Sequence, residues 1–364
     1  MNIGIDIRCL MEKNRTGVAE YTFGFLNSLF EKDSKNQYYL FYNSNKDVSK
    51  NIPKWGQENV HFIQKKYPNK LLNFFVWLRM IKLDKLTEKK LDYWFSPNLN
   101  FTNLSKKVKH IQTVHDLSFE IMPECFTNKQ RLWHWFLKPK SQCKRANIIL
   151  TPSENTKRDI ISKYKMESKK VEVLYPAVSS HIKQNTVSNN LDLPEKYLLY
   201  LGTLEPRKNV LSIIEAYKNF ELRTLNFELI LAGSRGWKNK KVLEQIENTP
   251  GVRYIGYVVE EDKLGLYQNA SLFVYPSLYE GFGLPVLEAM VSGVPVITSN
   301  RSSLPEVVGT SAYLVNPYNV DEIEKGMKLL LPDQDLRTKI IEKQKNQAEK
   351  FTWDKTTEEF LNLL

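Results

Sequence analysis

Short runs of apolar residues alternate along this chain with longer segments whose apolar residues recur at helical spacing. Runs of this kind, after a first one at 2–7, lie at 38–42, 60–63, 93–95, 110–114, 148–151 and 171–174, and later at 197–201, 227–232, 252–258, 272–275, 294–298 and 312–315. Apolar runs of four to six residues with helical connections are typical of buried parallel strands. The pattern predicts an α/β protein built from doubly wound sheets.

The chain divides near its middle. Residues 179–193 are polar and rich in asparagine, with no apolar period, as expected of a linker. A length of 364 residues is more than one hydrophobic core usually supports. We therefore predict an N-terminal domain over 1–184 and a C-terminal domain over 185–345, each Rossmann-like.

The segment 272–299 combines two predicted strands with a glycine-flanked loop and a helix. Gly281 and Gly283 surround Phe282, and Pro285 suits the first turn of a helix. The loop therefore brings an open helix N-terminus to whatever Glu280 faces. Glu288 follows only about 5–7 Å along the helix axis from Leu284. A buried turn with one solvated glutamate would explain these residues equally well.

Two further strand ends carry polar residues. Gly202 follows the strand at 197–201, and Arg207 and Lys208 are predicted in the first turn of the next helix. Cations there oppose the helix dipole, which favours a compensating anion such as a diphosphate, although two solvated basic residues are the alternative. His115 and Asp116 end another strand, at the edge where open sheets bind ligands. A structural histidine and a capping aspartate are the alternative here.

Glu280 and Glu288 are eight residues apart, with the sequence GFGLP directly after the first. This arrangement resembles the E-x7-E signature of retaining glycosyltransferases with the GT-B fold, in particular glycosyltransferase family 4. The segment from Gly202 to Asn209 is similar to the phosphate-binding segment of that family. The resemblance implies two Rossmann-like domains facing each other across a cleft, with a C-terminal helix, residues 346–364, crossing back to the first domain.

The resemblance also assigns roles to residues. It implies catalytic roles for His115, Glu280, Arg207 and Lys208. It implies contacts with the donor for a set of residues at strand ends and loops: Gly17, Gly202, Arg207, Lys208, Val258, Glu280, Gly281, Phe282, Gly283, Leu284 and Glu288. Among these, Glu288 would bind the nucleotide ribose, the loop after the strand ending at Val258 would meet the base, and His115 would line the sugar pocket.

The expected activity is retaining transfer of a hexose from a nucleotide-diphosphate sugar to a glycan or polyprenyl-diphosphate-linked acceptor in surface-polysaccharide biosynthesis. Mannose from GDP-mannose is the leading candidate, and a UDP-sugar is the alternative. No cofactor and no metal are expected, since the D-x-D string at 333–335 follows Pro332 between helical segments and is predicted to be a solvated cap. A non-hydrolysing sugar-nucleotide epimerase shares the fold, but no additional acid/base carboxylates for it are identified.

The distribution of charge raises a second possible class of function. The net charge is +11, and residues 1–185 hold 32 Lys and Arg against 17 Asp and Glu. Such a half can attract nucleic acid, an anionic membrane or a phosphorylated acceptor. A nucleic-acid-binding protein is the alternative, but it leaves Glu280, Glu288 and the Arg207-Lys208 pair unexplained, so no nucleic acid is expected.

The segments 71–86 and 126–145 mix aromatic and basic residues, which fits either interfacial helices on an anionic membrane or helices mostly buried on the sheet. Three scattered cysteines, no signal peptide and no long apolar run indicate a cytoplasmic protein, with peripheral contact at the inner face of the cell membrane as a further expectation.

Overall fold

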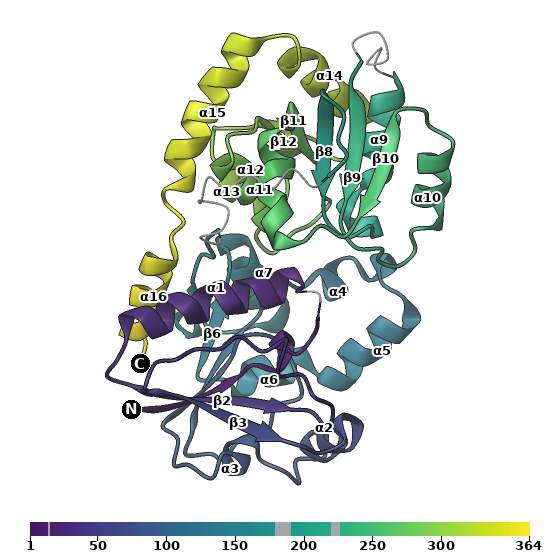
Figure 1. Cartoon of the computed structure of the whole chain (residues 1–364). Helices are drawn as coiled ribbons and strands as arrows, with labels where there is room; N and C mark the ends of the chain where they lie inside the picture. Colours follow the sequence, from purple (N-terminus) through teal and green to yellow (C-terminus); the bar gives the residue numbers. More distant parts are fainter. Residues whose placement is uncertain (14, 179–190, 220–225) are drawn as a thin grey trace. The chain divides into compact units, whose positions relative to one another are not determined.

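The computed structural model describes residues 1–13, 15–178, 191–219 and 226–364 (Figure 1). Contacts divide the chain into two compact units: unit 1 holds residues 1–117, 129–177 and 352–364, and unit 2 holds residues 118–128 and 178–351. The predicted boundary at 184/185, most of the predicted linker and Asn14 lie outside the described residues. Residues 118–128, assigned from the sequence to the first domain, belong to unit 2.

Unit 1 is built on a seven-stranded sheet in which all pairs are parallel, in the order β3-β2-β1-β4-β5-β6-β7. Its strands are β1 (Asn2–Asp6), β2 (Gln37–Asn43), β3 (Val60–Lys65), β4 (Tyr93–Ser96), β5 (Lys109–Thr113), β6 (Ile148–Thr151) and β7 (Val171–Val173). The chain order reverses direction between β1 and β4, which makes this the switch point of the sheet.

The helices of unit 1 connect these strands and cover the sheet. They are α1 (Gly17–Lys32), α2 (Asn69–Trp77), α3 (Leu83–Leu86), α5 (Asn128–Leu137), α6 (Pro139–Arg145), α7 (Glu154–Tyr164) and α16 (Trp353–Asn362), with short 3-10 turns at Arg8–Leu10 and Ser168–Lys170. The C-terminal α16 lies beside α1 (Figure 1). Phe360 packs edge-on against Phe25 and is fully buried, so this helix completes the core of unit 1.

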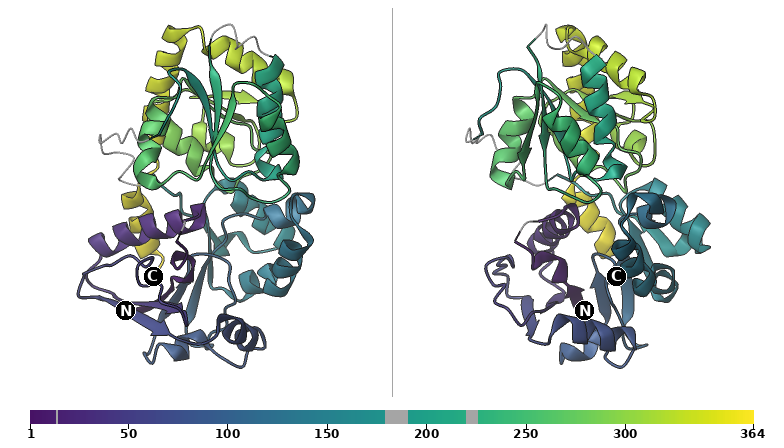
Figure 2. Two further views of the ribbon diagram at one scale, coloured as in Figure 1. Left: turned by 45° about the vertical axis from the view of Figure 1, so that its right-hand side comes forward. Right: turned by 90° about the vertical axis from the view of Figure 1, so that its right-hand side faces the viewer.

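Unit 2 repeats the plan with six parallel strands in the order β10-β9-β8-β11-β12-β13. The strands are β8 (Tyr197–Leu201), β9 (Glu228–Ala232), β10 (Val252–Gly256), β11 (Leu272–Tyr275), β12 (Val296–Ser299) and β13 (Tyr313–Val315). Every residue of β8 and β11 is buried, as continuous apolar strands are when helices cover both faces (Figure 2). The predicted strand 252–258 is too long: β10 ends at Gly256, whose φ of +81° turns the chain.

The helices of unit 2 include α4, which lies in the segment 118–128 between two stretches of unit 1. They are α4 (Ser118–Ile121), α9 (Val210–Asn219), α10 (Lys240–Glu247), α11 (Glu260–Gln268), α12 (Leu284–Val291), α13 (Leu304–Val308), α14 (Val320–Leu330) and α15 (Gln334–Ala348), with 3-10 turns at Pro123–Cys125 and Pro206–Lys208. Trp237 attaches residues 118–128 to the unit, because its indole Nε1 donates to the Cys125 carbonyl at 2.7 Å. Among the described residues, no helix combines the length and apolar content needed to span a bilayer.

The two aromatic and basic segments each contain a break. Arg79, with a left-handed φ of 62°, separates α2 from α3, and Lys138, with φ 50°, separates α5 from α6. Of the two alternatives left open for these segments, mostly buried helices do not fit α2 and α5: α2 buries only Leu72 and Val76, and α5 buries only Leu137. Periodicity could not show this, because nearly every face of these segments carries apolar residues.

Candidate functional site

The principal site residues come from two neighbouring strands of unit 2. Strands β8 and β11 pair in parallel, with Leu198 opposite Leu272, so the loops that follow them leave the sheet side by side. Unit 2 changes winding direction between these two strands, and the carboxyl edge at such a switch point is where open α/β sheets bind ligands. The pairing therefore brings the loop at 202–209 to the loop at 276–283.

Glycines allow a close backbone approach where the β8 loop begins. Gly233, which follows β9, has φ +124°, and a Cβ built there would lie 2.2 Å from the Gly202 carbonyl oxygen. Gly202 N donates to the Ala232 carbonyl at 2.9 Å, and Leu204 forms a bridge with Arg235 further on. The missing side chain of Gly233 thus lets the loop after β9 touch the loop after β8 at Gly202.

Arg207 and Lys208 lie just before a helix instead of in its first turn. They belong to the 3-10 turn Pro206–Lys208, and the helix α9 begins at Val210. Asn209 has a left-handed φ of 59°, and its side-chain amide donates to the Pro276 and Pro317 carbonyls. The left-handed residue interrupts the helical path, so the helix-dipole argument for these two cations does not hold.

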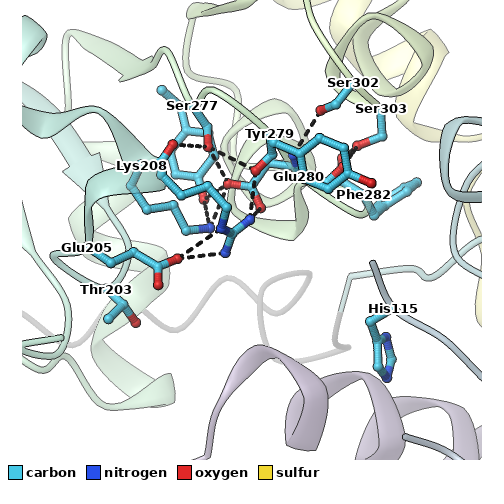
Figure 3. Close-up of polar contacts among 12 residues, drawn as sticks. His115, Thr203, Glu205, Lys208, Ser277, Tyr279, Glu280, Phe282, Ser302 and Ser303 are labelled. Carbon is cyan, nitrogen blue, oxygen red and sulfur yellow. Dashed lines mark hydrogen bonds and ion pairs between the residues drawn. The ribbon is translucent and has the colours of Figure 1, made fainter. Parts of the chain in front are cut away.

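Glu280 is the centre of a buried polar cluster (Figure 3). Its Oε1 accepts hydrogen bonds from Lys208 Nζ at 2.6 Å, Ser277 Oγ at 2.7 Å and Tyr275 Oη at 3.0 Å, and its Oε2 accepts from Arg207 at 2.9 Å. The Glu280 side chain is 8% exposed, and those of Arg207 and Lys208 are 13% and 11% exposed. The structure therefore brings together three of the four residues predicted to be catalytic.

A second carboxylate completes the charge balance. Glu205 Oε1 accepts from Arg207 at 2.6 Å, and its side chain is 4% exposed. Two cations are thus matched by two carboxylates, so the protein itself supplies compensation that the sequence analysis expected from a ligand. Lys208 Nζ donates to Glu280 and to the Tyr275 hydroxyl. An ammonium group has three donors, so within the described residues one N–H of Lys208 remains available.

Burial and charge within the cluster shift the pKa values of its ionisable side chains. Burial raises the pKa of Glu280, but Arg207 and Lys208 outweigh it and hold the pKa at about 2. Burial and the charge of Arg207 lower the pKa of Lys208, against the opposing effect of Glu280. Burial also raises the pKa of Tyr275 well above its usual value, so this hydroxyl stays protonated as a donor.

Acidification should weaken the fold through Glu280. The pKa of this carboxyl is depressed in the folded state, so its stabilisation is complete above the ordinary value of 4.5 and is lost as pH falls toward about 2. We expect wild type to lose on the order of 3 kcal/mol more than Glu280→Gln over this range. Chemical denaturation at a series of pH values measures this difference. An equal loss of unfolding free energy in wild type and Glu280→Gln would contradict the depressed pKa of Glu280.

Two serines that the sequence analysis missed hold the Glu280 loop. Ser302 Oγ accepts from the Glu280 backbone N–H at 2.8 Å, and Ser303 Oγ donates to the Glu280 and Phe282 carbonyls at 2.9 and 2.8 Å. Both follow β12, the strand beside β11. Tyr275, Ser277 and Glu205 were also missed. The signal available was position, since all five lie at or just after the carboxyl ends of central strands.

The loop leads into the helix α12 as predicted. Gly283, with φ 109°, is the N-cap residue and has no capping side chain, so the first amides of α12, including that of Leu284, are not capped from within the helix. Gly281 lies between Glu280 and Phe282, and Phe282 packs edge-on against Phe351. This end of α12 can present donors to an oxygen-rich ligand.

Glu288 and Val258 are not members of the Glu280 cluster. The Glu288 Oε2 atom accepts from the Tyr267 hydroxyl at 2.8 Å, and Lys263 Nζ lies 3.9 Å from Oε1. Val258, just after β10, is 4% exposed. These contacts do not involve Glu280, so the roles expected of Glu288 and Val258 remain predictions.

His115 and Gly17 belong to unit 1. His115 Nε2 lies 2.8 Å from the Pro97 carbonyl oxygen, and its ring meets Tyr21 edge-on at 4.8 Å. A carbonyl can only accept, so Nε2 carries the proton. Burial lowers the pKa of His115, against the Pro97 carbonyl and Asp116. The neutral ring therefore presents Nδ1 as an acceptor. Gly17 is the exposed first residue of α1, where Thr16 is the N-cap.

No group of three or more His, Cys, Asp or Glu side chains with metal-binding geometry occurs within the described ranges. The D-x-D string begins α15, where Asp333 accepts from the Leu336 amide at 2.8 Å as its N-cap. This agrees with the predicted cap.

Comparisons with known proteins cover both halves of the chain. Residues 182–347 match the family model "Glycosyl transferases group 1", and residues 32–181 match "Glycosyltransferase Family 4". The chain is 35% identical over 274 residues to O-antigen chain mannosyltransferase B of Escherichia coli, covering 72% of each protein. It is 28% identical over 263 residues to the serotype-specific mannosyltransferase WbdA of E. coli, covering 68% of this chain but only 32% of that longer protein.

A solved structure supports the fold. The sucrose-phosphate synthase of Thermosynechococcus elongatus superposes with a TM-score of 0.78 over 100% of this chain and 98% of that one, at 16% identity. Each unit described above is one Rossmann-like half of such a protein. The sequence match and the two parallel sheets agree, and the chain belongs to the GT-B glycosyltransferases of the family 4 type.

Proposed function

We propose that this glycosyltransferase moves mannose from GDP-mannose, with retention of configuration, to a glycan or polyprenyl-diphosphate-linked acceptor in surface-polysaccharide biosynthesis. The observation that carries the proposal is the Glu280 cluster, where Arg207 and Lys208 meet one buried carboxylate at the switch point of unit 2. Such a site combines cations for a diphosphate with an acceptor for sugar hydroxyls.

The cations act on the leaving group. In the proposed step, the bond between the anomeric carbon and the diphosphate oxygen breaks, the acceptor oxygen bonds to the same face of that carbon, and its proton passes to the departing diphosphate. Negative charge grows on the diphosphate, and Lys208 has an N–H donor left to meet it. Because two side-chain cations are already in place, we propose that transfer requires no metal.

The other residues position the donor. Glu280 would accept hydrogen bonds from sugar hydroxyls, while the amides from Phe282 to Leu284 would donate to them. The backbone after β10, near Val258, would contact the base, and Glu288 would bind the ribose. His115 would contribute a hydrogen-bond acceptor through Nδ1. A neutral histidine can accept a hydrogen bond from a sugar hydroxyl, and it adds no positive charge that would attract the diphosphate.

The choice of mannose is supported by the relatives, whose names describe mannosyltransferases. The residues described here do not distinguish between nucleotide bases. Guanosine is therefore proposed only because mannose is the proposed sugar. A UDP-sugar is the alternative donor. For the acceptor, the excess of cations in residues 1–185 supports a phosphate-bearing molecule. We place the protein on the cytoplasmic side of the membrane, where nucleotide sugars and such an acceptor would meet.

A thermal-shift panel tests the donor. GDP, UDP, ADP and dTDP, each alone and as sugar conjugates, would be compared with and without a chelator. We expect stabilisation by GDP-mannose, approaching about 2.7 kcal/mol at a hundredfold excess over Kd, and no effect of the chelator. Stabilisation by UDP-sugars alone would replace the donor, and loss of the shift with the chelator would contradict metal independence. A shift with oligonucleotides alone would overturn the enzyme function.

A further inference from the structure

A cavity lies at the amino edge of the unit 1 sheet. Its volume is about 360 Å³, within the range of about 300–1,000 Å³ that is common for small-molecule sites. His110, the second residue of β5, and Asn147, just before β6, form part of its lining. His115 follows the opposite end of β5, a strand of five residues that spans roughly 16 Å. The cavity is therefore separate from the sheet edge at which His115 lies.

The side chains that line this cavity carry positive charge only. Arg145, the last residue of α6, and Lys106 belong to the lining, which contains no acidic residue. Arg145 Nη1 donates to Ser141 Oγ at 2.6 Å, and in the described chain the other four of its five N–H donors have no partner. Asp84 accepts from the Ser105 backbone N–H at 2.8 Å but does not itself line the cavity. Arg145 is thus a charged donor group without a carboxylate.

Further cations act on the same residues. Burial and the charge of Arg79 lower the pKa of Arg145. Burial and the charges of Arg145 and Lys170 lower the pKa of His110 to about 3, so this histidine is neutral and does not add to the charge. Cations that repel one another beside an enclosed space favour a bound anion, which lowers the energy of all of them.

The lining also offers hydrogen-bond acceptors. Gln142 is 3% exposed, and its Nε2 donates to the Leu137 carbonyl at 2.8 Å, whereas its Oε1 accepts no hydrogen bond from any described residue. Asn103 Nδ2 donates to the Ile81 carbonyl at 2.8 Å, which leaves its Oδ1 as an acceptor. A buried polar atom without a partner costs stability, and a ligand with hydroxyl donors would supply the partner.

We propose that this cavity binds a small phosphate ester with free hydroxyl groups, of about the size of a hexose phosphate. Arg145 and Lys106 bind the phosphate group, and Gln142 and Asn103 accept hydrogen bonds from the hydroxyls. Inorganic phosphate fills only part of a cavity of this volume, and an uncharged sugar leaves Arg145 without a partner. The site involves no residue of the Glu280 cluster, so the inference does not depend on the proposed donor.

Calorimetric titration of the full chain tests the proposal, with mannose 6-phosphate, inorganic phosphate and mannose as probes. We expect mannose 6-phosphate to bind at least about tenfold more tightly than inorganic phosphate, and mannose to give no detectable binding. Arg145→Gln should weaken binding of mannose 6-phosphate by about tenfold to a hundredfold. Lys106→Gln, at an exposed position that the fold tolerates, should weaken it by a smaller factor.

Gln142→Met tests the recognition of hydroxyls. It keeps the length of the side chain but removes the acceptor, so the affinity ratio of mannose 6-phosphate to inorganic phosphate should fall toward one. A merely structural role of Gln142 would leave this ratio unchanged. Arg158→Gln, which removes an exposed arginine of α7 outside the cavity, is the matched control and should bind like wild type. Melting of each variant confirms folding.

Lys208→Met separates this site from the Glu280 cluster. It should keep wild-type affinity for mannose 6-phosphate, so failure of the donor assignment and failure of the cavity proposal give different results. Loss of binding in Lys208→Met together with normal binding in Arg145→Gln would assign the ligand to the cluster and overturn the proposal. Equal affinity of wild type for inorganic phosphate and mannose 6-phosphate would also overturn it, as would absence of binding by all three probes.

Discussion

Replacing Glu280 by glutamine is expected to reduce sugar transfer by at least about 10²-fold while leaving nucleotide-diphosphate binding intact or tighter. The carboxylate accepts hydrogen bonds from Arg207 and Lys208 at 2.9 and 2.6 Å, so its loss leaves both cations less neutralised. Those cations should then attract a diphosphate more strongly. The sugar loses the acceptor that orients it, so the defect should appear in kcat.

The measurement combines initial rates of transfer with calorimetric titration of nucleoside diphosphate. Breaking a buried ion pair costs about 3–5 kcal/mol, and the glutamine oxygen recovers part of this by accepting one of the same hydrogen bonds. Melting should therefore confirm a folded protein. The matched control is Glu324→Gln, a glutamate 14% exposed and paired with Lys328 on α14. Near-normal turnover in Glu280→Gln would disprove the orienting role.

Replacing Lys208 by methionine should impair both steps. Methionine keeps the length and apolar stem, but removes the ammonium that donates to Glu280 and Tyr275 and has a further donor for a ligand. We expect transfer to fall by about 10³-fold or more, because charge growing on the diphosphate loses its nearest compensation. Affinity for nucleoside diphosphate should fall by about tenfold to a hundredfold, as loss of a charged hydrogen bond implies.

The two substitutions thus differ in sign for diphosphate binding, which a merely structural cluster would not produce. Arg207 remains paired with both Glu205 and Glu280 in Lys208→Met, so the loops should stay ordered. Lys328→Met, from the same α14 ion pair, is the control. Equal diphosphate affinity in Lys208→Met and wild type would remove Lys208 from the donor site.

Much of the candidate site could be predicted because the residues expected in it follow the ends of apolar strands. The runs at 197–201 and 272–275 correspond to β8 and β11, and both were visible from the pattern of apolar residues alone. Gly202 and Glu280 could be placed in loops after those strands without knowledge of the sheet order, whereas Arg207 and Lys208 were expected in the first turn of α9 and lie in the 3-10 turn before it. The resemblance to family 4 then identified the family that the comparisons show.

Strand order could not be read from local pattern, and it decides which loops meet. Arg207 and Glu280 are 73 residues apart, and they touch because β8 pairs with β11 across the switch point. The same neighbour relation, of β11 with β12, brings Ser302 and Ser303 under the Glu280 loop. Pairing between distant strands is set by backbone hydrogen bonds and by packing of both faces, neither of which a single apolar run records.

Apolar periodicity and local motifs were enough to predict two parallel α/β sheets, the glycine-flanked loop at Glu280 and the family of the protein. Three features became visible only in the folded chain: Glu205 and Glu280 neutralise Arg207 and Lys208, residues 118–128 belong to unit 2, and α2 and α5 are exposed. The physical reason is common to all three. Apolar periodicity reports that a residue can be buried, whereas contact and exposure depend on which distant element reaches that residue.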